Sequence, residues 1–312
     1  MARIGVDLGG TKIEAALMAD DGNLTLRRRP TPAGDYEATL AQVVDLVSEL
    51  EAVHGTSCRV GVGHPGAVSP VTGLIKNANS TCLLDHDLKS DLESRLGREV
   101  RLANDADCFA LSEAVDGAAM GASTVFGVIL GTGVGGGVVV NGKLLHGPNA
   151  IAGEWGHNSL PGLKGDEQPG PACYCGRRGC IETFLSGPGL VADHLRATAT
   201  TRTPGHGPSD RSPDPPTAAL VAALAEAGDE DARASLSRYE QRLARALASV
   251  INIIDPEVIV LGGGLSRITG LYQSVPRLWL PFVFSDRVAT RLLPPAHGDA
   301  GGVRGAAWLW PA

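Results

Sequence analysis

A histidine and three cysteines lie close together near the middle of the chain. His157 is followed by the spacing C-x-C-x4-C, which Cys173, Cys175 and Cys180 form. Three sulfurs and one imidazole suit a tetrahedral zinc ion with no coordination position left for water. The alternative is a trio of free thiols, or one disulfide with a spare thiol. We predict a bound structural zinc ion, because three of the six cysteines fall within eight residues.

Two glutamates flank this cluster. Glu154 lies three residues before His157, and Glu182 lies two residues after Cys180. A closed zinc site would hold both carboxylates in fixed positions, and carboxylates accept hydrogen bonds from hydroxyl groups. The arrangement therefore predicts a scaffold for binding a substrate rather than a catalytic metal.

Two glycine-rich segments match nucleotide-binding spacings without the context that these motifs require. Residues 131–136 fit G-x-G-x-x-G, but a β-like segment follows them, whereas dinucleotide binding needs a helix there. Residues 137–143 fit the P-loop spacing, but Leu144 replaces the required serine or threonine. We therefore expect neither dinucleotide binding nor a P-loop.

Backbone amides in three other glycine-rich turns are better candidates for holding nucleotide phosphates. The first, D-x-G-G-T-K at 7–12, offers amide donors, two side-chain donors and an aspartate that can organise a metal ion. A G-T-G turn at 131–133 offers similar amide donors. Three glycines at 262–264, after a later strand, let the backbone approach a flat ligand. Each turn alone could be an ordinary tight turn. The predicted nucleotide-binding residues are Asp7, Gly9, Gly10, Thr11, Lys12, Gly131, Thr132, Gly133, Gly262, Gly263 and Gly264.

The order of strand-like and helix-like segments occurs twice along the chain. Three β-rich runs over residues 3–30, the last two separated by Asp20-Asp21-Gly22, precede alternating helices and strands. From residue 124, β-rich runs with Asn141-Gly142 as a hairpin turn begin a similar block. The repetition predicts a duplicated α/β fold in which helices pack on mixed sheets.

Apolar spacing locates the individual elements. It predicts helices at 35–54, 87–96, 106–120, 189–197, 218–227 and 230–254, and strands at 58–64, 99–104 and 257–264. Residues 202–216 hold five prolines and no apolar run, so we expect a surface loop there. A short terminal helix should pack back on the first block. We place one domain at 1–119 together with 297–312, and a larger one, carrying the zinc site, at 120–296.

Composition narrows the class of protein. A length of 312 residues suits two domains, and 43% hydrophobic with 20% charged residues is ordinary for a globular protein. The net charge of −7 argues against a nucleic-acid partner. We expect no membrane partner, because no apolar run reaches the roughly 18–20 residues that span a bilayer. The start of the chain lacks a signal-peptide pattern, and the remaining cysteines, Cys58, Cys82 and Cys108, are scattered, so we expect a cytoplasmic protein.

Eight motifs between residues 4 and 309 resemble, in order, those of ROK-family sugar kinases. They are IGVDLGGTKIE, GHPGAVSP, RLANDADCFALSEA, GVILGTGVGGG, GEWGH, CYCGRRGCIE, DPEVIVLGGG and HGDAGGVRGAAWL. The resemblance implies the actin-like (ribonuclease-H-like) ATPase fold, with two α/β domains around a central cleft. Through KNANST, EAVDGAA and EWGHN, the chain is most similar to the bacterial fructokinase (mannofructokinase) branch.

The resemblance also implies roles for individual residues. Asp105 corresponds to the catalytic base, which takes the proton of a sugar hydroxyl as that hydroxyl attacks the γ-phosphorus. A helix N-cap is the alternative role for Asp105. Magnesium would accompany ATP, with Asp7 near it, and zinc would be structural; a homodimer is usual. The implied substrate-binding residues are Asn79, Asn104, Asp105, Glu154, His157 and Glu182.

We expect ATP-dependent phosphorylation of D-fructose to fructose 6-phosphate. Alternatives within the family are N-acetylglucosamine, glucose or mannose as the substrate, and a more remote one is a non-catalytic nucleotide-binding regulator. Cys82 stands where similar kinases often have tryptophan, so we expect the apolar rim of the sugar pocket to differ from theirs. The family's repressors carry a helix-turn-helix before the first motif, and because the first strand begins by residue 3 we do not expect a repressor.

Overall fold

The computed structural model describes residues 2–19, 22–78, 80–201 and 216–311. The predicted turn residues Asp20 and Asp21, the predicted substrate residue Asn79 and the proline-rich segment 202–215 lie outside them. By their contacts the residues divide into two compact units. The first comprises Met1–Gly127, Gly136–Gly153 and Pro295–Ala312, and the second comprises Val128–Gly135 and Glu154–Pro294.

The first unit contains a mixed five-stranded sheet with the order β3-β2-β1-β4-β7. Strands β1 to β3 form the predicted antiparallel meander, whereas β4 and β7 add to β1 in parallel. The strands are β1 (Arg3–Leu8), β2 (Lys12–Met18), β3 (Leu24–Pro30), β4 (Arg59–His64) and β7 (Val100–Asn104). A small antiparallel pair, β5 (Ala67–Val68) and β6 (Ile75–Lys76), follows β4.

Local signals in the sequence set the ends of the helices of this unit. Helix α1 (Tyr36–His54) begins after Asp35, whose carboxylate accepts from the N–H of Ala38, and ends at Gly55 in the left-handed conformation. Helix α2 (Leu88–Leu96) has the same kind of ends at Asp87 and Gly97. Both helices begin and end within one residue of their predicted bounds.

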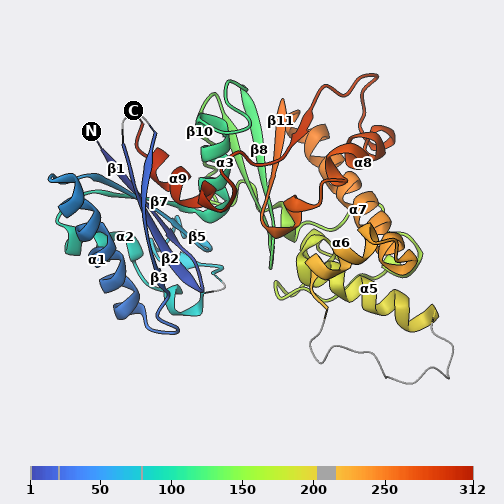
Figure 1. Ribbon diagram of the computed structural model, residues 1–312, viewed down its shortest axis with the longest axis horizontal. Helices are drawn as coiled ribbons and strands as arrows, with labels where there is room; N and C mark the ends of the chain where they lie inside the picture. Colours follow the sequence, from blue (N-terminus) through green and yellow to red (C-terminus); the bar gives the residue numbers. More distant parts are fainter. Residues whose placement is uncertain (1, 20–21, 79, 202–215, 312) are drawn as a thin grey trace. The chain divides into compact units, whose positions relative to one another are not determined.

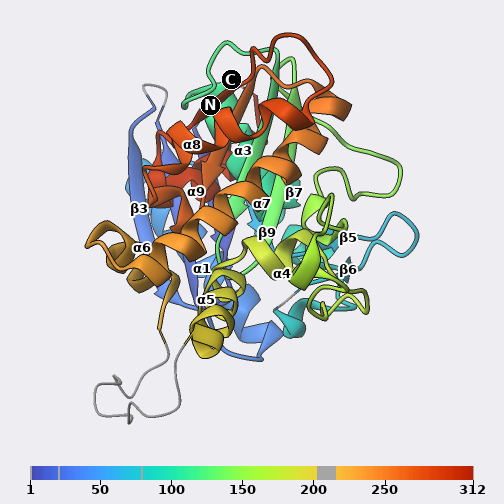
Figure 2. The ribbon, with the colours of Figure 1, turned by 90° about the vertical axis from the view of Figure 1, so that its right-hand side faces the viewer.

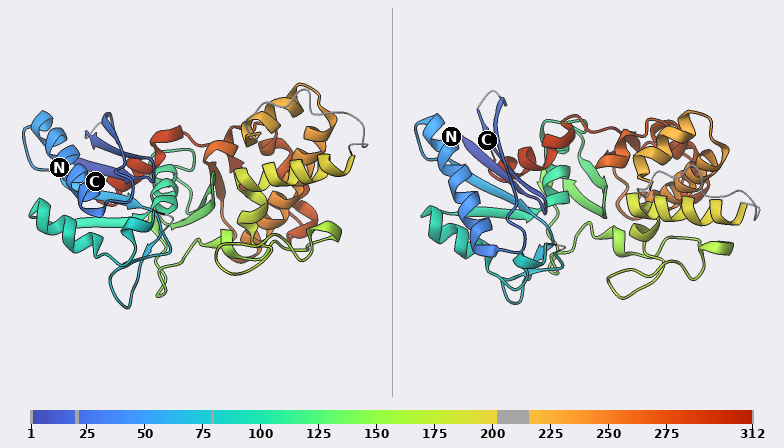
Figure 3. Two further views of the ribbon diagram at one scale, coloured as in Figure 1. Left: turned by 90° about the horizontal axis from the view of Figure 1, so that it is seen from below. Right: turned by 60° about the horizontal axis from the view of Figure 1, so that its bottom comes forward.

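The terminal helix α9 (Gly301–Trp308) packs on the opposite face of the sheet from α1 (Figure 1). Two strand glycines make this close packing possible. A Cβ atom at Gly5 would lie 1.9 Å from the carbonyl oxygen of Val303, and one at Gly61 would lie 1.9 Å from that of Ala306. Strands β1 and β4 therefore pack directly against the last helix, which also lies beside them in Figure 3. The predicted return of the terminal helix is confirmed.

Helix α3 (Asp105–Val115) is shorter than the helix predicted at 106–120. The helix ends at Val115 with Asp116 as its C-cap, and the carboxylate of Glu113 accepts from the N–H of Ala118 at 2.8 Å. That contact replaces a further helical turn, which the apolar spacing alone did not reveal.

A second mixed five-stranded sheet has the order β10-β9-β8-β11-β12. Its strands are β8 (Thr124–Leu130), β9 (Val134–Val140), β10 (Lys143–Leu144), β11 (Val258–Gly262) and β12 (Arg291–Leu293). Strands β8 and β9 each run from one unit into the other, so 136–153 belongs to the first unit by contacts. The sequence analysis placed the domain boundary at 119/120, whereas the contacts divide the chain within β8 and β9. The boundary at 119/120 stays a prediction.

Helices of the second unit surround the long helix α7 (Figure 2). They are α4 (Ile181–Leu185), α5 (Gly187–Thr201), α6 (Ala218–Glu226), α7 (Glu230–Ile254) and α8 (Leu271–Leu278). Short 3-10 turns occur at Thr81–Leu83, Trp155–His157, Gly165–Glu167, Gly264–Arg267, Leu280–Phe282 and Gly298–Ala300. Within the described residues, every helix is too short or too polar to cross a lipid bilayer.

Candidate functional site

The four predicted zinc ligands converge in the second unit. The ligand atoms of His157, Cys173, Cys175 and Cys180 all lie within 4.8 Å of one another. Nδ1 of His157 is 3.6 Å from Sγ of Cys173, and Sγ of Cys175 is 3.6 Å from Sγ of Cys180. Zn–S and Zn–N bonds of about 2.3 and 2.0 Å in a tetrahedron would place ligand atoms roughly 3.5–3.8 Å apart. The donor set therefore fits zinc.

The chemistry of the thiols agrees with this fit. Burial raises the pKa of Cys173 and raises that of Cys180 to about 12, whereas hydrogen bonds from Arg177 lower the pKa of Cys175 to about 6. Three thiolates this close together repel one another, and a divalent cation removes that penalty. The site would then have four protein ligands and no open position, as a structural zinc site has.

The other nitrogen of His157 has a partner that the sequence did not reveal. Nε2 lies 2.9 Å from the hydroxyl of Tyr174, and the two rings meet edge to face with centroids 5.0 Å apart. With Nδ1 as a zinc ligand, Nε2 carries the proton and donates to the tyrosine oxygen. The resemblance implied that His157 binds the substrate, and the hydroxyl of Tyr174 instead contacts the ring nitrogen that zinc would leave free.

Tyr174 belongs to the same neighbourhood as both predicted substrate-binding glutamates. Loss of water around the phenol and the negative charges of Glu182, Cys173 and Glu154 raise the pKa of Tyr174 to about 12. A cavity of about 310 Å³ is lined by Tyr174, Glu182, Cys173 and Thr132, among others. Tyr174 sits between two zinc ligands in C-x-C, and that position was the only signal in the sequence that could have identified it.

Glu182 connects the predicted sugar and phosphate regions. Its Oε2 accepts a 2.9 Å hydrogen bond from the N–H of Val134, directly after the G-T-G turn. A Cβ atom at Gly133 would lie 2.7 Å from the same oxygen, so a side chain at this position would displace the carboxylate. The other predicted glutamate, Glu154, directly precedes the 3-10 turn Trp155–His157, and the indole N–H of Trp155 anchors that turn on the carbonyl of Gly135 at 2.9 Å.

The two glycine turns of the second unit, predicted separately, lie side by side. Gly263 has a φ of +78°, and a Cβ atom there would come within 2.4 Å of the carbonyl oxygen of Leu130. Leu130 directly precedes the G-T-G turn, in which the N–H of Gly131 donates to the carbonyl of Gly133 at 3.0 Å. Thr132 at the tip is exposed. This pairing of turns leaves amides and a threonine hydroxyl near one surface, a suitable set for phosphate oxygens.

The first unit brings the predicted catalytic residue close to Asp7. Burial, followed by the negative charges of Asp105 and Glu14, raises the pKa of Asp7 to about 6, and Lys12 acts in the opposite direction. Two carboxylates that repel each other in a partly buried place form a favourable position for a divalent cation. Asp7 is the last residue but one of β1 and Asp105 begins α3, so two elements of one unit position both groups.

Asn104, rather than Asp105, is the cap of helix α3. Its Oδ1 accepts from the N–H of Ala106 at 2.9 Å, and its Nδ2 donates to the carbonyl of Gly66 at 2.9 Å. Asp105 is the first helical residue, exposed, and its Oδ1 also accepts from Ala106. The capping role that competed with the base role thus falls mainly to the neighbouring asparagine.

The predicted phosphate turn at 7–12 has one departure from expectation. Gly9 and Thr11 shape the turn, since the N–H of Gly9 donates to the carbonyl of Lys12 and the N–H of Thr31 to that of Thr11. The ammonium of Lys12, however, is 3.2 Å from Glu14, a buried carboxylate that also binds Arg28. Lys12 therefore has an acidic partner within its own sheet, whereas we had expected it to donate to phosphate.

A family model with the description ROK family matches residues 3–312. The chain belongs to the ROK family. Among curated relatives, an N-acetyl-D-glucosamine kinase of Pectobacterium atrosepticum is 39% identical, with 98% of this chain and 97% of the relative covered. Another N-acetyl-D-glucosamine kinase, of Citrobacter koseri, is 41% identical, with 98% of both chains covered.

Solved structures of other ROK proteins share the fold. A ROK hexokinase from Thermus thermophilus is 30% identical with a TM-score of 0.81, over 98% of this chain and 97% of that one. A ROK family glucokinase from Streptomyces griseus, in complex with glucose and AMPPNP, is 29% identical with a TM-score of 0.79, over 99% of both. The actin-like ATPase fold that the motifs implied is thereby confirmed for this ROK chain, with its two mixed five-stranded sheets.

Proposed function

We propose that this ROK protein is an ATP-dependent sugar kinase that phosphorylates N-acetylglucosamine. The observation that carries the proposal is the match, over nearly the whole chain, to N-acetyl-D-glucosamine kinases at 39–42% identity. These relatives favour N-acetylglucosamine over D-fructose, the substrate that we had expected from short motifs. The motifs KNANST and EWGHN cover few residues, whereas the relatives match 98% of the chain.

The site residues of the first unit and those of the second unit would have different roles in phosphoryl transfer. In the first unit, Asp105 takes the proton as the oxygen of a sugar hydroxyl forms a bond to the γ-phosphorus. The bond between the γ-phosphorus and the oxygen of the departing ADP breaks in the same exchange. Asp7 would hold the magnesium ion that accompanies ATP. Asn104 keeps the start of α3, and with it Asp105, in place through Ala106 and Gly66.

In the second unit, Glu154, His157 and Glu182 would accept from or donate to the remaining hydroxyls of the sugar. The paired glycine turns would bind phosphate oxygens through backbone amides. Zinc, when bound, supplies no chemistry to the substrate; it fixes the ring of His157 and the segment that carries Cys173 to Cys180. Magnesium and a homodimeric state stay predictions.

A coupled assay of ADP release over separate hexoses tests this proposal. N-Acetylglucosamine, D-fructose, glucose and mannose are each offered with magnesium and ATP. We expect N-acetylglucosamine to give the highest kcat/KM, and 6-deoxy-N-acetylglucosamine to give no release above the background because it lacks the accepting hydroxyl. Release with the 6-deoxy sugar that equals release with the parent sugar would contradict transfer to the 6-hydroxyl.

A further inference from the structure

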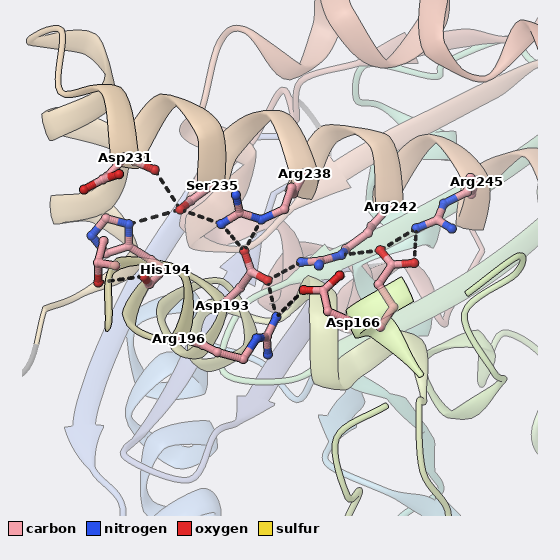
Figure 4. A network of polar contacts seen from close by, with 11 residues as sticks. Asp166, Asp193, His194, Arg196, Asp231, Ser235, Arg238, Arg242 and Arg245 are labelled. Atoms are coloured by element: carbon pink, nitrogen blue, oxygen red, sulfur yellow. Dashed lines mark hydrogen bonds and ion pairs between the residues drawn. The ribbon is translucent and has the colours of Figure 1, made fainter. Parts of the chain in front are cut away.

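Helix α7 carries three arginines on one face, and their guanidinium groups bind two carboxylates (Figure 4). Arg238, Arg242 and Arg245 are four and three residues apart, which places them along one side of the helix. Glu167 bridges Arg242 and Arg245 at 2.9 and 2.7 Å, and Asp193 of α5 bridges Arg242 and Arg238 at 2.8 and 2.7 Å. Arg242 is 1% exposed, so this network is largely removed from water.

Glu167 lies in the segment that separates the first zinc ligand from the next. This segment, residues 158–172, is named here the zinc loop. The N–H of Lys164 donates to Glu167 at 3.0 Å, and Arg245 donates to the carbonyl of Gly162. Residues 173–180 are named here the zinc-binding turn. Both ends of the zinc loop contact this turn, because Leu160 donates to the carbonyl of Gly179 and Ala172 pairs with Arg178. The arginines of α7 therefore anchor the middle of the loop, away from the metal ligands.

Arg242 also contacts the helix that carries Glu182. Its Cζ lies 5.2 Å from the centroid of the Phe184 ring, and Phe184 is two residues after Glu182 in α4. One buried guanidinium thus meets the zinc loop, α4 and α5 at once. The zinc loop directly follows His157, and α4 carries Glu182. Both residues are proposed to bind the sugar.

The network costs free energy that apolar packing would avoid. Taking charged groups out of water is unfavourable, and buried ion pairs are often no more stabilising than well-packed apolar residues. In addition, Nη2 of Arg242 is buried without a hydrogen-bond acceptor among the described residues. A guanidinium fork binds carboxylates only in specific orientations, so the cluster constrains how the elements that carry its members lie against one another.

We propose that Arg242 and Arg245, acting through Glu167, are positioning residues for the sugar site. They hold the zinc loop and α4 against α7, so that His157 and Glu182 keep the arrangement that binds sugar hydroxyls. The inference rests on the proposed function for the identity of the substrate. The anchoring of the zinc loop by α7 stands on the contacts alone.

Steady-state kinetics of the zinc-loaded protein with three variants tests the positioning role. Arg242→Met keeps the volume and leaves Glu167 paired with Arg245 and Asp193 paired with Arg238. Glu167→Gln removes the shared carboxylate. Arg238→Met is the matched control, because Arg238 lies on the same helix and binds Asp193 and Ser235 without touching the zinc loop.

We expect Arg242→Met and Glu167→Gln to raise the KM for the sugar at least about tenfold, since small displacements of positioned groups are costly. The KM for ATP should stay within about twofold of its original value in both variants. Arg238→Met should leave both KM values unchanged. A sugar KM that stays unchanged in folded Arg242→Met and Glu167→Gln would overturn the proposal, as would equal rises in the sugar and ATP values.

The rate of zinc transfer to a chromogenic chelator provides a readout that needs no substrate. We expect faster transfer from Arg242→Met and Glu167→Gln than from the original protein or from Arg238→Met, by about tenfold or more. Equal rates in all four proteins would overturn the anchoring. If the original protein phosphorylates no sugar, the proposed function fails, and the transfer rates still decide whether α7 holds the zinc loop.

Discussion

Oε2 of Glu182 accepts a hydrogen bond of 2.9 Å from the backbone N–H of Val134. The contact joins a glutamate proposed to bind the sugar to the strand that follows a turn proposed to bind phosphate. Because Cys180 lies two residues before Glu182, the zinc-binding turn is tied into the same arrangement. Direct contacts and short chain segments thus join the zinc-binding turn, Glu182 and the G-T-G turn of the second unit.

Removal of one zinc ligand should therefore disturb sugar binding more than ATP binding. We expect Cys175→Ser to bind less than one equivalent of zinc and to raise the KM for the sugar, because the oxygen of serine is a far poorer zinc ligand than a thiolate. Metal analysis of protein purified without a chelator checks the zinc content, with about one equivalent expected for the original chain. Full activity of zinc-free protein would rule out the structural role.

Asp105→Asn should stop phosphoryl transfer while leaving sugar affinity nearly unchanged. The amide keeps the shape and can still accept a hydrogen bond, but it cannot take the proton of the attacking hydroxyl. Loss of a general base lowers kcat by roughly 10²–10⁴-fold. Rapid-quench measurement of the product, together with equilibrium binding of the sugar, separates the two effects. Turnover close to that of the original protein would assign the base role to another group.

Asp7 should make the protein less stable as the pH rises. Its pKa is raised from 3.8 to about 6, so the folded state holds a proton that the unfolded state has lost between these values. Stability from this group is therefore fully present below about pH 4 and is lost as the pH rises through about 6. The difference of about two pKa units corresponds to at most about 3 kcal/mol.

Asp7→Asn removes this titration. We expect the variant to be more stable than the original protein at pH 7 without magnesium, by about 1–3 kcal/mol, and equally stable near pH 4. It should also need more magnesium for activity. Urea unfolding at the two pH values measures the difference, with Asp35→Asn, at an exposed helix cap, as a control for general charge removal. A variant that is destabilised equally at both values would contradict the raised pKa of Asp7.

Tyr174→Phe tests the competition for the ring nitrogen of His157. The phenol oxygen accepts the hydrogen bond that a sugar hydroxyl would otherwise accept, so the sugar must displace it. Loss of one such hydrogen bond is worth about 0.5–1.5 kcal/mol, and the KM for the sugar should fall by roughly two- to tenfold. Zinc content should not change. A higher KM in this variant would mean that Tyr174 holds the ring for the sugar rather than blocking it.

Much of the fold could be predicted because its signals are local. Asp35 and Gly55 mark both ends of α1 through hydrogen bonds within one turn, and Asp229 does the same at the start of α7. Helix α8 was missed, because Pro276 lies inside it and interrupts the apolar pattern. The early end of α3 depends on a carboxylate that turns back on the chain, which spacing does not report.

The candidate site likewise has features that the sequence predicts and features that it does not. The zinc ligands were predictable because they lie within one short segment whose spacing is itself the signal. The contact of the Tyr174 hydroxyl with His157 and the contacts of the α7 arginines with Glu167 depend on side-chain orientations that only tertiary packing determines. Arg242 and Glu167 are 75 residues apart in the sequence, and neither occurs in a recognisable motif.

Direct competition between two sugars tests the central claim most directly. Equal concentrations of N-acetylglucosamine and D-fructose are mixed with the protein, magnesium and limiting ATP, and both sugar phosphates are quantified by mass spectrometry. The product ratio equals the ratio of the two kcat/KM values. We predict that N-acetylglucosamine 6-phosphate exceeds fructose 6-phosphate by at least about tenfold, as the loss of one matched polar contact would give. An excess of fructose 6-phosphate would contradict the assigned substrate, and the absence of both products would contradict a hexose kinase.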